Sequence, residues 1–466
     1  MIKLGFYGAA GEVTGSCYIL TTDRAQVMVD MGMHQGEKVA DEHNRRLPPA
    51  DLSRINAVVL THAHLDHCGR LPLLIQNGYR GEIHCTAPTS GITEIILRDS
   101  ARLQAEDYAR SLRHLHNHHN NRNHPEPLYS ELDVEHTLPL LRTLAYDEVR
   151  TIADGISIKL VDAGHILGAS SVQMTVNDGS RTITIVFSGD VGQVGAPILR
   201  DPVTPTPADV VLLESTYGDR DHQPLDRTVD QLLAILRDAQ ASGGKVIIPA
   251  FAVGRAQDLI FHIGEFLRNH QLKNINVYLD SPMARSVSAL YSRYTNVYDA
   301  RATELLSEHL QPLNFPGMSY IETVDESKQL NEAKGPMVVV AANGMCSGGR
   351  VMHHLLHNLP NPHTHVVIAG YQGQGTLGRR LVERANEVSI FGQRVSVHAK
   401  VHTLSGFSAH AGQTGLLNWA APFQTSKPRF FLTHGEDRPR TALHDKLQAR
   451  FNLNSAMPHY GEVVEL

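Results

Sequence analysis

The sequence has one tryptophan, four cysteines and no excess of positive charge. The cysteines are widely spaced and form no CxxC pair (Cys17, Cys68, Cys85 and Cys346), which argues against a disulfide framework and against a thiolate zinc site. No run of about 18 or more apolar residues is present, which argues against a membrane span. The start of the chain also lacks the pattern of a secretion signal. These absences predict a protein of the reducing cytoplasm with no membrane partner.

The net charge of −6 provides no general attraction to nucleic acid. A polyanionic substrate would therefore need a local positive field from metal ions and a few arginines. Hydrophobic residues make up 42% of the chain and charged residues 19%, which is typical of a globular protein. The 466 residues suffice for two or three domains. Histidine is frequent, with 28 residues, but only the positions of the histidines can indicate metal binding.

Apolar runs bounded by turn residues predict a strand-rich first part, residues 1–218. In residues 219–393, strands alternate with helices of about 10–15 residues, which is typical of a parallel sheet covered by helices on both faces. Strand-rich character returns in residues 394–466, beginning with a strand expected over residues 394–404. The sequence therefore predicts an α/β protein in which one domain, 1–218 and 394–466, is interrupted by an inserted α/β domain, 219–393.

A dense group of potential metal ligands follows one apolar strand. Residues 59–69 (VLTHAHLDHCG) place His62, His64, Asp66 and His67 within six positions. Imidazole and carboxylate groups suit zinc. On an extended segment His62 and His64 point to the same side, and the other two lie on the following turn. A single histidine would fit an ordinary strand end, whereas this combination favours two adjacent metal sites.

Two further ligand candidates stand at glycine-rich strand exits, where a loop can present a side chain to a shared site. His165 follows residues 161–164 (VDAG), and Asp190 follows residues 185–189 (IVFSG). Alone, either residue could be an ordinary turn residue. Beside the dense group, both are predicted to be ligands.

Together with Asp30, at the end of residues 26–30 (QVMVD), this pattern resembles the metallo-β-lactamase fold. That family stacks two β-sheets between helices in an αββα sandwich. The resemblance implies one zinc ion bound by His62, His64 and His165, a second bound by Asp66 and His67, and Asp190 bridging the two. It also implies that Asp30 orients a ligand histidine. The superfamily hydrolyses many kinds of bond, so the resemblance alone does not define a substrate.

Three later segments are similar to the β-CASP branch, whose members are nucleases. They are residues 212–219 (LLESTYGD), 406–411 (GFSAHA) and 431–436 (FLTHGE). Their functional residues would be Glu214, His410 and His434. The inserted α/β segment also lies where this branch carries its β-CASP domain. RNA-cleaving members carry histidine in the third segment and DNA-cleaving members tend to carry valine, so His434 indicates RNA.

Phosphodiester hydrolysis needs a hydroxide nucleophile, charge stabilisation at the phosphate and a proton for the leaving oxygen. Two zinc ions about 3.5–4 Å apart can supply the first two. We expect His410 to protonate the leaving oxygen, with Glu214 orienting it. His434 would complete the second zinc site. We expect Asp66 to act in catalysis as well as to bind metal. The alternatives are that His410 caps the helix that follows it and that Glu214 forms a plain salt bridge at a strand end.

Three segments of the inserted domain also resemble family signatures: residues 251–257 (FAVGRAQ), 342–350 (ANGMCSGGR) and 370–379 (GYQGQGTLGR), the last two rich in glycine. Exposed backbone N–H groups, helix N-termini and nearby arginines can hold phosphates, although glycine-rich turns are common without a ligand. The residues expected to contact RNA are Arg255, Ser347, Gly348, Arg350, Gly375 and Arg379.

The resemblance implies a zinc-dependent ribonuclease that cuts single-stranded RNA endonucleolytically and holds two Zn²⁺ per chain. The chain is similar to the short bacterial members and to the nuclease subunit of the cleavage and polyadenylation specificity factor. Three alternatives stay open: a hydrolase of a small thioester or lactone, an RNA-binding scaffold with a degenerate site, and a redox di-iron protein.

The sequence leaves the oligomeric state open, with a homodimer as one option. It also leaves open the natural RNA and any activity on DNA. For the histidine-rich segment from His114 to His124 we favour a solvated loop over a metal site.

Overall fold

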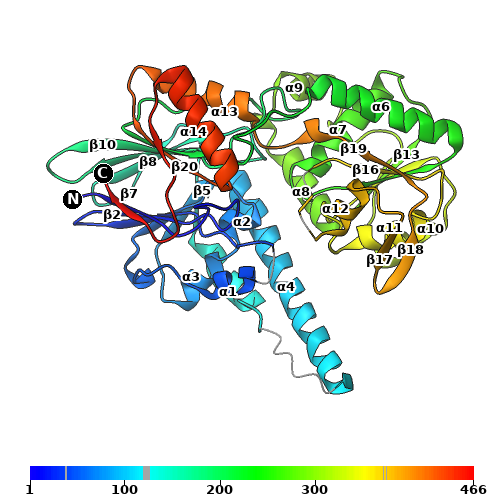
Figure 1. The fold of residues 1–466 in the computed structure, drawn as a ribbon, viewed down its shortest axis with the longest axis horizontal. Coiled ribbons are helices and arrows are strands. Elements are labelled where there is room, and N and C mark those ends of the chain that lie inside the picture. The colour runs from blue at the N-terminus through cyan, green and yellow to red at the C-terminus, as the bar shows by residue number, and fades with distance from the viewer. Residues whose placement is uncertain (37–38, 119–125, 371, 374) are drawn as a thin grey trace. The chain divides into compact units, whose positions relative to one another are not determined.

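The computed structural model describes residues 1–36, 39–118, 126–370, 372–373 and 375–466. Its contacts divide the chain into two units (Figure 1). The first unit comprises Met1–Gly192, Pro202–Asp221 and His410–Leu466, and the second comprises Gln193–Asp201 and His222–Ala409. Within the described residues, no helix is both long and apolar enough to cross a membrane.

The first unit contains two seven-stranded sheets. The order in one sheet is β22 (Val463–Glu465), β1 (Lys3–Phe6), β2 (Tyr18–Thr21), β3 (Gln26–Val29), β4 (Ala57–Val59), β5 (Glu82–Thr86) and β6 (Leu141–Leu144). The order in the other is β21 (Ser455–Ala456), β20 (Arg429–Thr433), β11 (Val210–Glu214), β10 (Thr182–Phe187), β9 (Ser170–Asn177), β8 (Ile156–Asp162) and β7 (Val149–Ala153). Each sheet is antiparallel at one end and parallel at the other.

Helices cover the outer faces of this pair of sheets (Figure 1). On the second sheet lie α13 (Gln413–Ala420) and α14 (Asp437–Phe451). On the first lie α3 (Leu71–Gln76), α4 (Ala87–His118) and α5 (Glu131–Thr137), with the short α1 (Val39–Arg45) and α2 (Leu65–Cys68) in adjoining loops. The predicted αββα sandwich is confirmed. Helix α4 extends to His118, so the loop expected from His114 to His124 is wrong for residues 114–118, and residues 119–124 of that segment lie outside the described residues.

The side chains of strand β10 belong to two hydrophobic cores. Ile185 and Phe187 face the layer between the two sheets, whereas Val186 belongs to the cluster that α13 and α14 cover. Successive side chains of a strand point to opposite faces. The apolar run 185–187 at the end of β10 therefore reflects burial on both faces of the second sheet.

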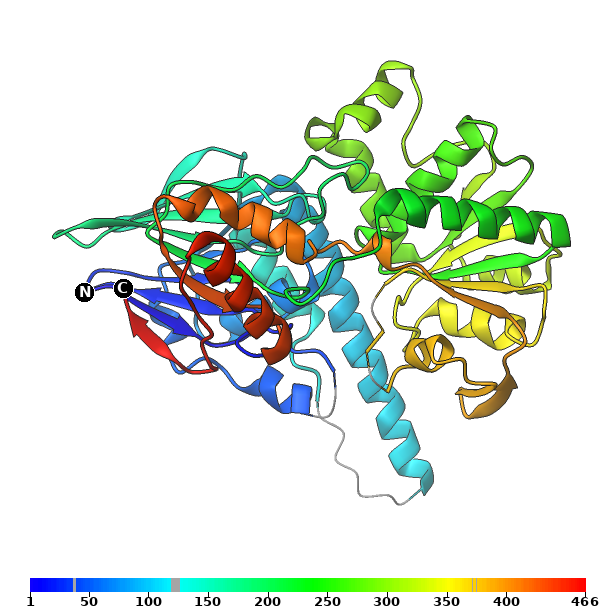
Figure 2. The same cartoon turned by 45° about the horizontal axis from the view of Figure 1, so that its top comes forward.

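The second unit has a six-stranded parallel sheet in the order β14 (Met318–Tyr320), β13 (Asn276–Asp280), β15 (Met337–Ala341), β12 (Lys245–Pro249), β16 (His365–Ile368) and β19 (Lys400–Thr403). Helices α6 (Leu225–Ser242) and α7 (Arg255–Arg268) cover one face (Figure 2). On the other face, α10 (Val324–Glu332), α11 (Arg350–Asn358) and α12 (Leu377–Val382) pack on the sheet. Helices α8 (Pro282–Arg293) and α9 (Ala300–Ser307) complete the unit. The predicted inserted parallel sheet is confirmed.

The strand predicted over residues 394–404 is wrong in part. It consists of two strands, β18 (Gln393–Ser396), which forms a hairpin with β17 (Glu387–Ile390), and β19, which pairs with β16 in the second unit. Between them, the amides of His398 and Ala399 donate to the carbonyl of Leu359 rather than to a strand. The contacts divide the chain at Ala409/His410, whereas the domain boundaries 1–218, 219–393 and 394–466 stay a prediction.

A buried charged network holds α10 and α11 at the carboxyl edge of the parallel sheet in the second unit. Asp280, fully buried at the end of β13, lies 2.6 Å from His354 Nε2 and accepts hydrogen bonds from Ser327 at 2.5 Å and Arg350 at 2.6 Å. Burial, the largest influence, raises the pKa of Asp280, but the bonds from His354, Ser327 and Arg350 together outweigh it and lower the pKa. The charged carboxylate therefore stabilises the folded second unit.

We expect Asp280→Ala to lower the free energy of unfolding by about 3–5 kcal/mol, because the variant removes the buried carboxylate that pairs with Arg350 and also bonds to Ser327 and His354. The difference from wild type should be full above the ordinary pKa of aspartate and should shrink as the pH falls below it. Urea denaturation at several pH values measures this effect. Asp325→Ala, at an exposed ion pair with Lys328, is the control and should cost less than about 1 kcal/mol. Equal effects of the two changes would contradict the prediction.

Candidate metal centre

The predicted ligands lie on loops that follow the carboxyl ends of strands in the first unit. His62 and His64 follow β4, and Asp66 and His67 lie in α2, directly afterwards. The remaining ligands follow three strands of the second sheet: His165 after β8, Asp190 after β10 and His434 after β20. Strands β8, β10 and β20 run in the same direction, so their carboxyl ends meet at one edge. The topology thus collects residues separated by up to several hundred positions.

One group of ligand atoms has the spacing of a tetrahedral site. His64 Nδ1 lies 3.2 Å from His62 Nε2 and 3.1 Å from His165 Nε2. Asp190 Oδ2 lies 3.4 Å from each of these two Nε2 atoms. Ligands about 2.0–2.1 Å from a tetrahedral ion stand about 3.3–3.4 Å from one another. These four side chains therefore fit around an ion of the size of zinc.

A second group lies directly beside the first. His67 Nε2 is 3.3 Å from His434 Nε2, which is 3.5 Å from Asp66 Oδ2. The other carboxylate oxygen of Asp190, Oδ1, is 3.4 Å from His67 Nε2. Asp190 thus offers one oxygen to each group, as a ligand shared by two ions would.

Asp190 itself is buried, with 2% of its surface exposed. Among the described residues, its Oδ1 has no hydrogen-bond donor, and such an oxygen is costly unless a cation compensates it. The loop that carries Asp190 also lies against the loop that carries His165: a Cβ on Gly192 would come within 2.0 Å of the carbonyl oxygen of Gly164. Only glycine at position 192 permits this close approach.

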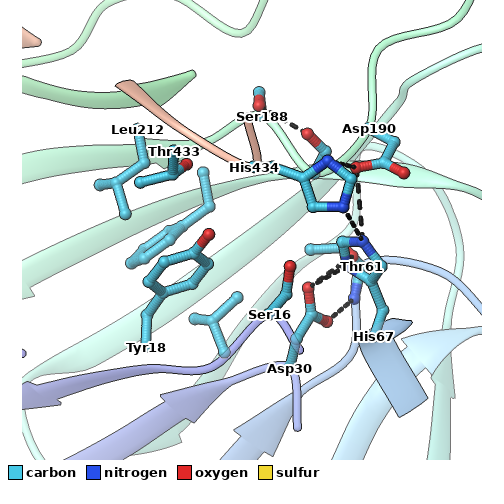
Figure 3. A pocket seen from close by; sticks show the side chains of 13 residues that line it. Ser16, Tyr18, Asp30, Thr61, His67, Ser188, Asp190, Leu212, Thr433 and His434 are labelled. Atoms are coloured by element: carbon cyan, nitrogen blue, oxygen red, sulfur yellow. Dashed lines mark hydrogen bonds and ion pairs between the residues drawn. The ribbon is translucent and has the colours of Figure 1, made fainter. Parts of the chain in front are cut away.

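Neighbouring polar groups hold the ligand rings in place (Figure 3). Asp30 Oδ2 lies 2.8 Å from His67 Nδ1 and accepts a hydrogen bond from Thr61 Oγ1 at 2.8 Å. On the other side, Thr216 Oγ1 lies 3.0 Å from His434 Nδ1. Asp30 was predicted from the sequence, whereas the two threonines were not. The only sequence signal for these threonines is that they lie near predicted site residues: Thr61 precedes His62, and Thr216 lies in the segment that carries Glu214.

Burial and nearby carboxylates act differently on the pKa values of the histidines in the site. Burial lowers the pKa of His62 and lowers that of His64 to about 4, so both imidazoles are neutral. Burial acts in the same direction on His67, but the carboxylates of Asp190 and Asp30 outweigh it and raise the pKa of His67. A cation bound at His67 would therefore displace a proton.

Glu214 and His410 form a pair at the rim of the centre. Glu214, 1% exposed, accepts hydrogen bonds from the amides of Val191 at 3.1 Å and Thr216 at 3.0 Å. Its Oε1 lies 3.2 Å from His410 Nδ1. The helix after His410 has Gly412 as its N-cap and no side-chain capping bond. The arrangement favours a His–Glu pair over a capping histidine and over a plain surface salt bridge.

The surroundings of His410 favour its protonated form. Burial, the largest influence, lowers the pKa, but the charges of Glu214 and Asp190 outweigh it and raise the pKa of His410 to about 9. The bridge between Gly192 and His410, together with the amide of Ala411 donating to the carbonyl of Val191 at 2.8 Å, ties this segment to the Asp190 loop. The chain can thus hold a proton donor close to a metal centre.

The residues expected to contact RNA lie in the second unit, in the loops and helix starts that follow the adjacent strands β12, β15 and β16. Ligands of parallel sheets bind outside such carboxyl ends. All three arginines already interact with protein groups: Arg350 with Asp280 and the carbonyl of Glu322, Arg379 with Glu383, and Arg255 with Asp258. All six contacts stay predictions (Arg255, Ser347, Gly348, Arg350, Gly375 and Arg379).

Comparisons with known proteins agree with this geometry. Residues 10–250 match the metallo-beta-lactamase superfamily. The chain belongs to this superfamily. Residues 256–381 match the Beta-Casp domain, and residues 394–458 match the Zn-dependent metallo-hydrolase RNA specificity domain. The interpretation of the chain as a metal-dependent hydrolase of the β-CASP branch is confirmed.

Curated relatives of this β-CASP protein extend over nearly its whole length. It is 40% identical to a ribonuclease of Thermus thermophilus, over 98% of each chain. It is 31% identical to an RNase J-like protein of Methanocaldococcus jannaschii, over 94% of this chain and 93% of the relative. It is 27% identical to a transcription termination factor of Pyrococcus horikoshii, over 100% of this chain and 71% of the relative.

A solved structure of a protein of unknown function from Enterococcus faecalis resembles the β-CASP protein in fold alone. The TM-score is 0.57 and the identity 13%, with both chains covered completely.

We expect Asp30→Asn to weaken metal binding about 10–100-fold, because the carboxylate that orients His67 loses its charge. Chelator competition with Zn²⁺ measures the affinity. The matched control is Asp154→Asn, where the carboxylate is 64% exposed, and it should bind Zn²⁺ like the wild type. Unchanged affinity in a folded Asp30→Asn protein would contradict the role of Asp30.

Proposed function

We propose that this β-CASP protein is a zinc-dependent endoribonuclease that hydrolyses phosphodiester bonds of single-stranded RNA and binds two Zn²⁺ per chain. The observation that carries this proposal is the Glu214–His410 pair beside a seven-residue, two-centre ligand set. Hydrolysis of a small thioester or lactone would use the metal centre but would leave this pair without a role.

The comparisons support RNA as the substrate. A domain described by its RNA specificity matches residues 394–458, which contain both His410 and His434. The relative that is 40% identical over almost the full length is named a ribonuclease. Histidine at position 434, where DNA-cleaving members of the family tend to have valine, supports the same substrate.

The donor types support zinc. Five histidines and two aspartates offer nitrogen and oxygen ligands, which suit zinc better than the oxygen-rich sets of magnesium or calcium. Two bound ions would lower the pKa of a water between them and stabilise charge on the phosphate oxygens. The remaining chemistry belongs to protein side chains.

His410 would supply the proton for the leaving oxygen of the ribose. Its Nδ1 faces Glu214, so Nε2 is the ring nitrogen that can reach the substrate. Glu214 fixes the orientation of the ring and stabilises its charged form, while its bonds to the amides of Val191 and Thr216 hold the carboxylate in place. Proton transfer from a group positioned in this way typically contributes about 10²–10⁴-fold to a rate.

The location and assembly of the protein are secondary parts of the proposal. All four cysteines are free and buried, which supports a reducing cytoplasm. Endonucleolytic cutting, the preference for single strands and a homodimeric state stay predictions.

We expect His410→Ala to cut internally labelled single-stranded RNA about 10²–10⁴-fold more slowly than the wild type while keeping its metal content. The control is His459→Ala, at an exposed histidine outside the site, which should cut at the wild-type rate. Internal fragments from the wild type would support endonucleolytic cleavage, and matching DNA tests the substrate class. A wild-type protein that leaves RNA intact but hydrolyses a thioester or lactone would overturn the nuclease proposal and leave the metal centre standing.

Glu214→Gln keeps an acceptor for the amide of Val191 but removes the charge that faces His410. A hydrogen bond to a charged group is worth about 1.5–3 kcal/mol, so the cleavage rate should fall roughly ten- to a hundred-fold. Because Glu214 acts through His410, the double variant should be no slower than His410→Ala alone. Additive losses in the double variant would show that Glu214 acts independently.

A further inference from the structure

A third group of potential ligands lies in the first unit, outside the centre described above. Glu12 belongs to the loop between β1 and β2, His34 to the loop after β3, and His43 to α1. One ligand atom from each lies within 4.8 Å of the others. We infer that Glu12, His34 and His43 form a third divalent-cation site, of the zinc type, which goes beyond the proposed ribonuclease activity.

The spacing of the first pair matches that of the main centre. His34 Nδ1 lies 3.3 Å from Glu12 Oε2, which is about the separation of two ligands on a tetrahedral ion. His43 presents its ring to His34 edge to face, with centroids 5.2 Å apart. A simple ion pair between Glu12 and His34 accounts only for the first contact. His43, which also stacks on Tyr460 with centroids 6.5 Å apart, brings a second imidazole to the pair.

The backbone around the two histidines is held in place from two directions. The amide of His34 donates to the Asn44 side chain at 2.7 Å, and that side chain donates back to the carbonyl of His34 at 2.9 Å. The buried guanidinium of Arg70 donates to the carbonyls of Gly32 and His43. Ordered ligand backbones lower the entropic cost of capturing an ion.

A glycine makes room for the buried imidazole. Gly15 has φ +75°, and a Cβ there would come within 2.4 Å of the His34 ring. The side chain of His34 is 2% exposed, whereas that of Glu12 is 35% exposed. An ion would therefore reach the site from the side of Glu12.

The chemistry of the donors indicates the ion. Two imidazoles and one carboxylate are ligands that suit zinc, with the fourth position left to water. Arg70 is a cation near this group, and its bonds to backbone carbonyls direct its charge towards them. The single carboxylate of Glu12 supplies the negative charge.

An ion here would brace the main centre. The carbonyl of Glu12 accepts a hydrogen bond from the amide of Gly435 at 3.0 Å, and that of Ala9 accepts one from His434 at 2.7 Å. The loop that carries Glu12 therefore supports the backbone of a ligand in the main centre. The third ion has a structural role, because it touches no residue of the Glu214–His410 pair.

The test counts zinc ions on the whole chain by native mass spectrometry after metal removal and reloading with Zn²⁺ alone. We expect three ions per wild-type chain and two in both His43→Ala and Glu12→Gln. Glu12→Gln preserves shape and the backbone bond to Gly435, so it keeps the test valid if His43→Ala fails to fold. Anomalous diffraction at the zinc edge should show a peak among the three side chains.

The histidine-rich segment 114–124 is the rival source of a third ion, so a variant with its five histidines changed to asparagine is the matched control. It should retain three ions. Two ions on the wild type, loss of the third ion in the segment variant, or three ions in both His43→Ala and Glu12→Gln would each overturn the inference. RNA cleavage is measured in parallel: a chain that cuts RNA with two ions refutes only this site, and one that holds three ions without cutting RNA refutes only the nuclease proposal.

Discussion

The arrangement of the first unit depends on how the negative charge of one buried carboxylate is compensated. Asp190 has almost no contact with solvent, and one of its oxygens receives no hydrogen bond within the described residues. A charge in that position is stable only when cations or polarised donors surround it. The loops after β4, β8 and β20 all deliver histidines to it. Their lengths, their glycines and their mutual hydrogen bonds are consequences of that demand.

The insertion of a whole α/β unit leaves this arrangement intact because the strands on either side of it pair directly. Strand β11 precedes the inserted residues and β20 follows them, and the two are parallel neighbours with Glu214 opposite Thr433. The first unit therefore regains its register where it was interrupted. Glu214 and His434 meet at the same sheet edge, which joins the His–Glu pair to the ligand set.

Much of the site could be predicted from the sequence because its signals are local. Four ligands lie within six consecutive positions (His62, His64, Asp66 and His67). Two more, His165 and Asp190, follow apolar strands that end at glycines. The αββα sandwich and the inserted parallel sheet were predictable for the same reason, since strand and helix periodicities differ. The strand expected over residues 394–404 was wrong in part because an edge strand of four residues, such as β19, carries no signal of its partner.

Other features depend on tertiary structure alone. No characteristic spacing in the sequence marks Glu12, His34 and His43. They meet only because the fold brings together the loop between β1 and β2, the loop after β3 and helix α1. Arg350 was predicted to contact phosphate, but Asp280, distant in sequence, already engages its guanidinium. A sequence pattern identifies an arginine, but it does not show which partner the folded chain provides.

The pairing of β11 with β20 has a consequence for the order of events during synthesis. These strands are separated by roughly 200 residues, and contacts between such distant segments form late in folding. A nascent chain that has emerged only as far as β11 already contains six of the seven ligands of the main centre, but neither His410 nor His434. The proton donor and the last ligand both lie in the final eighth of the chain. The ligand set of the centre is therefore complete only when the C-terminal segment pairs with β11.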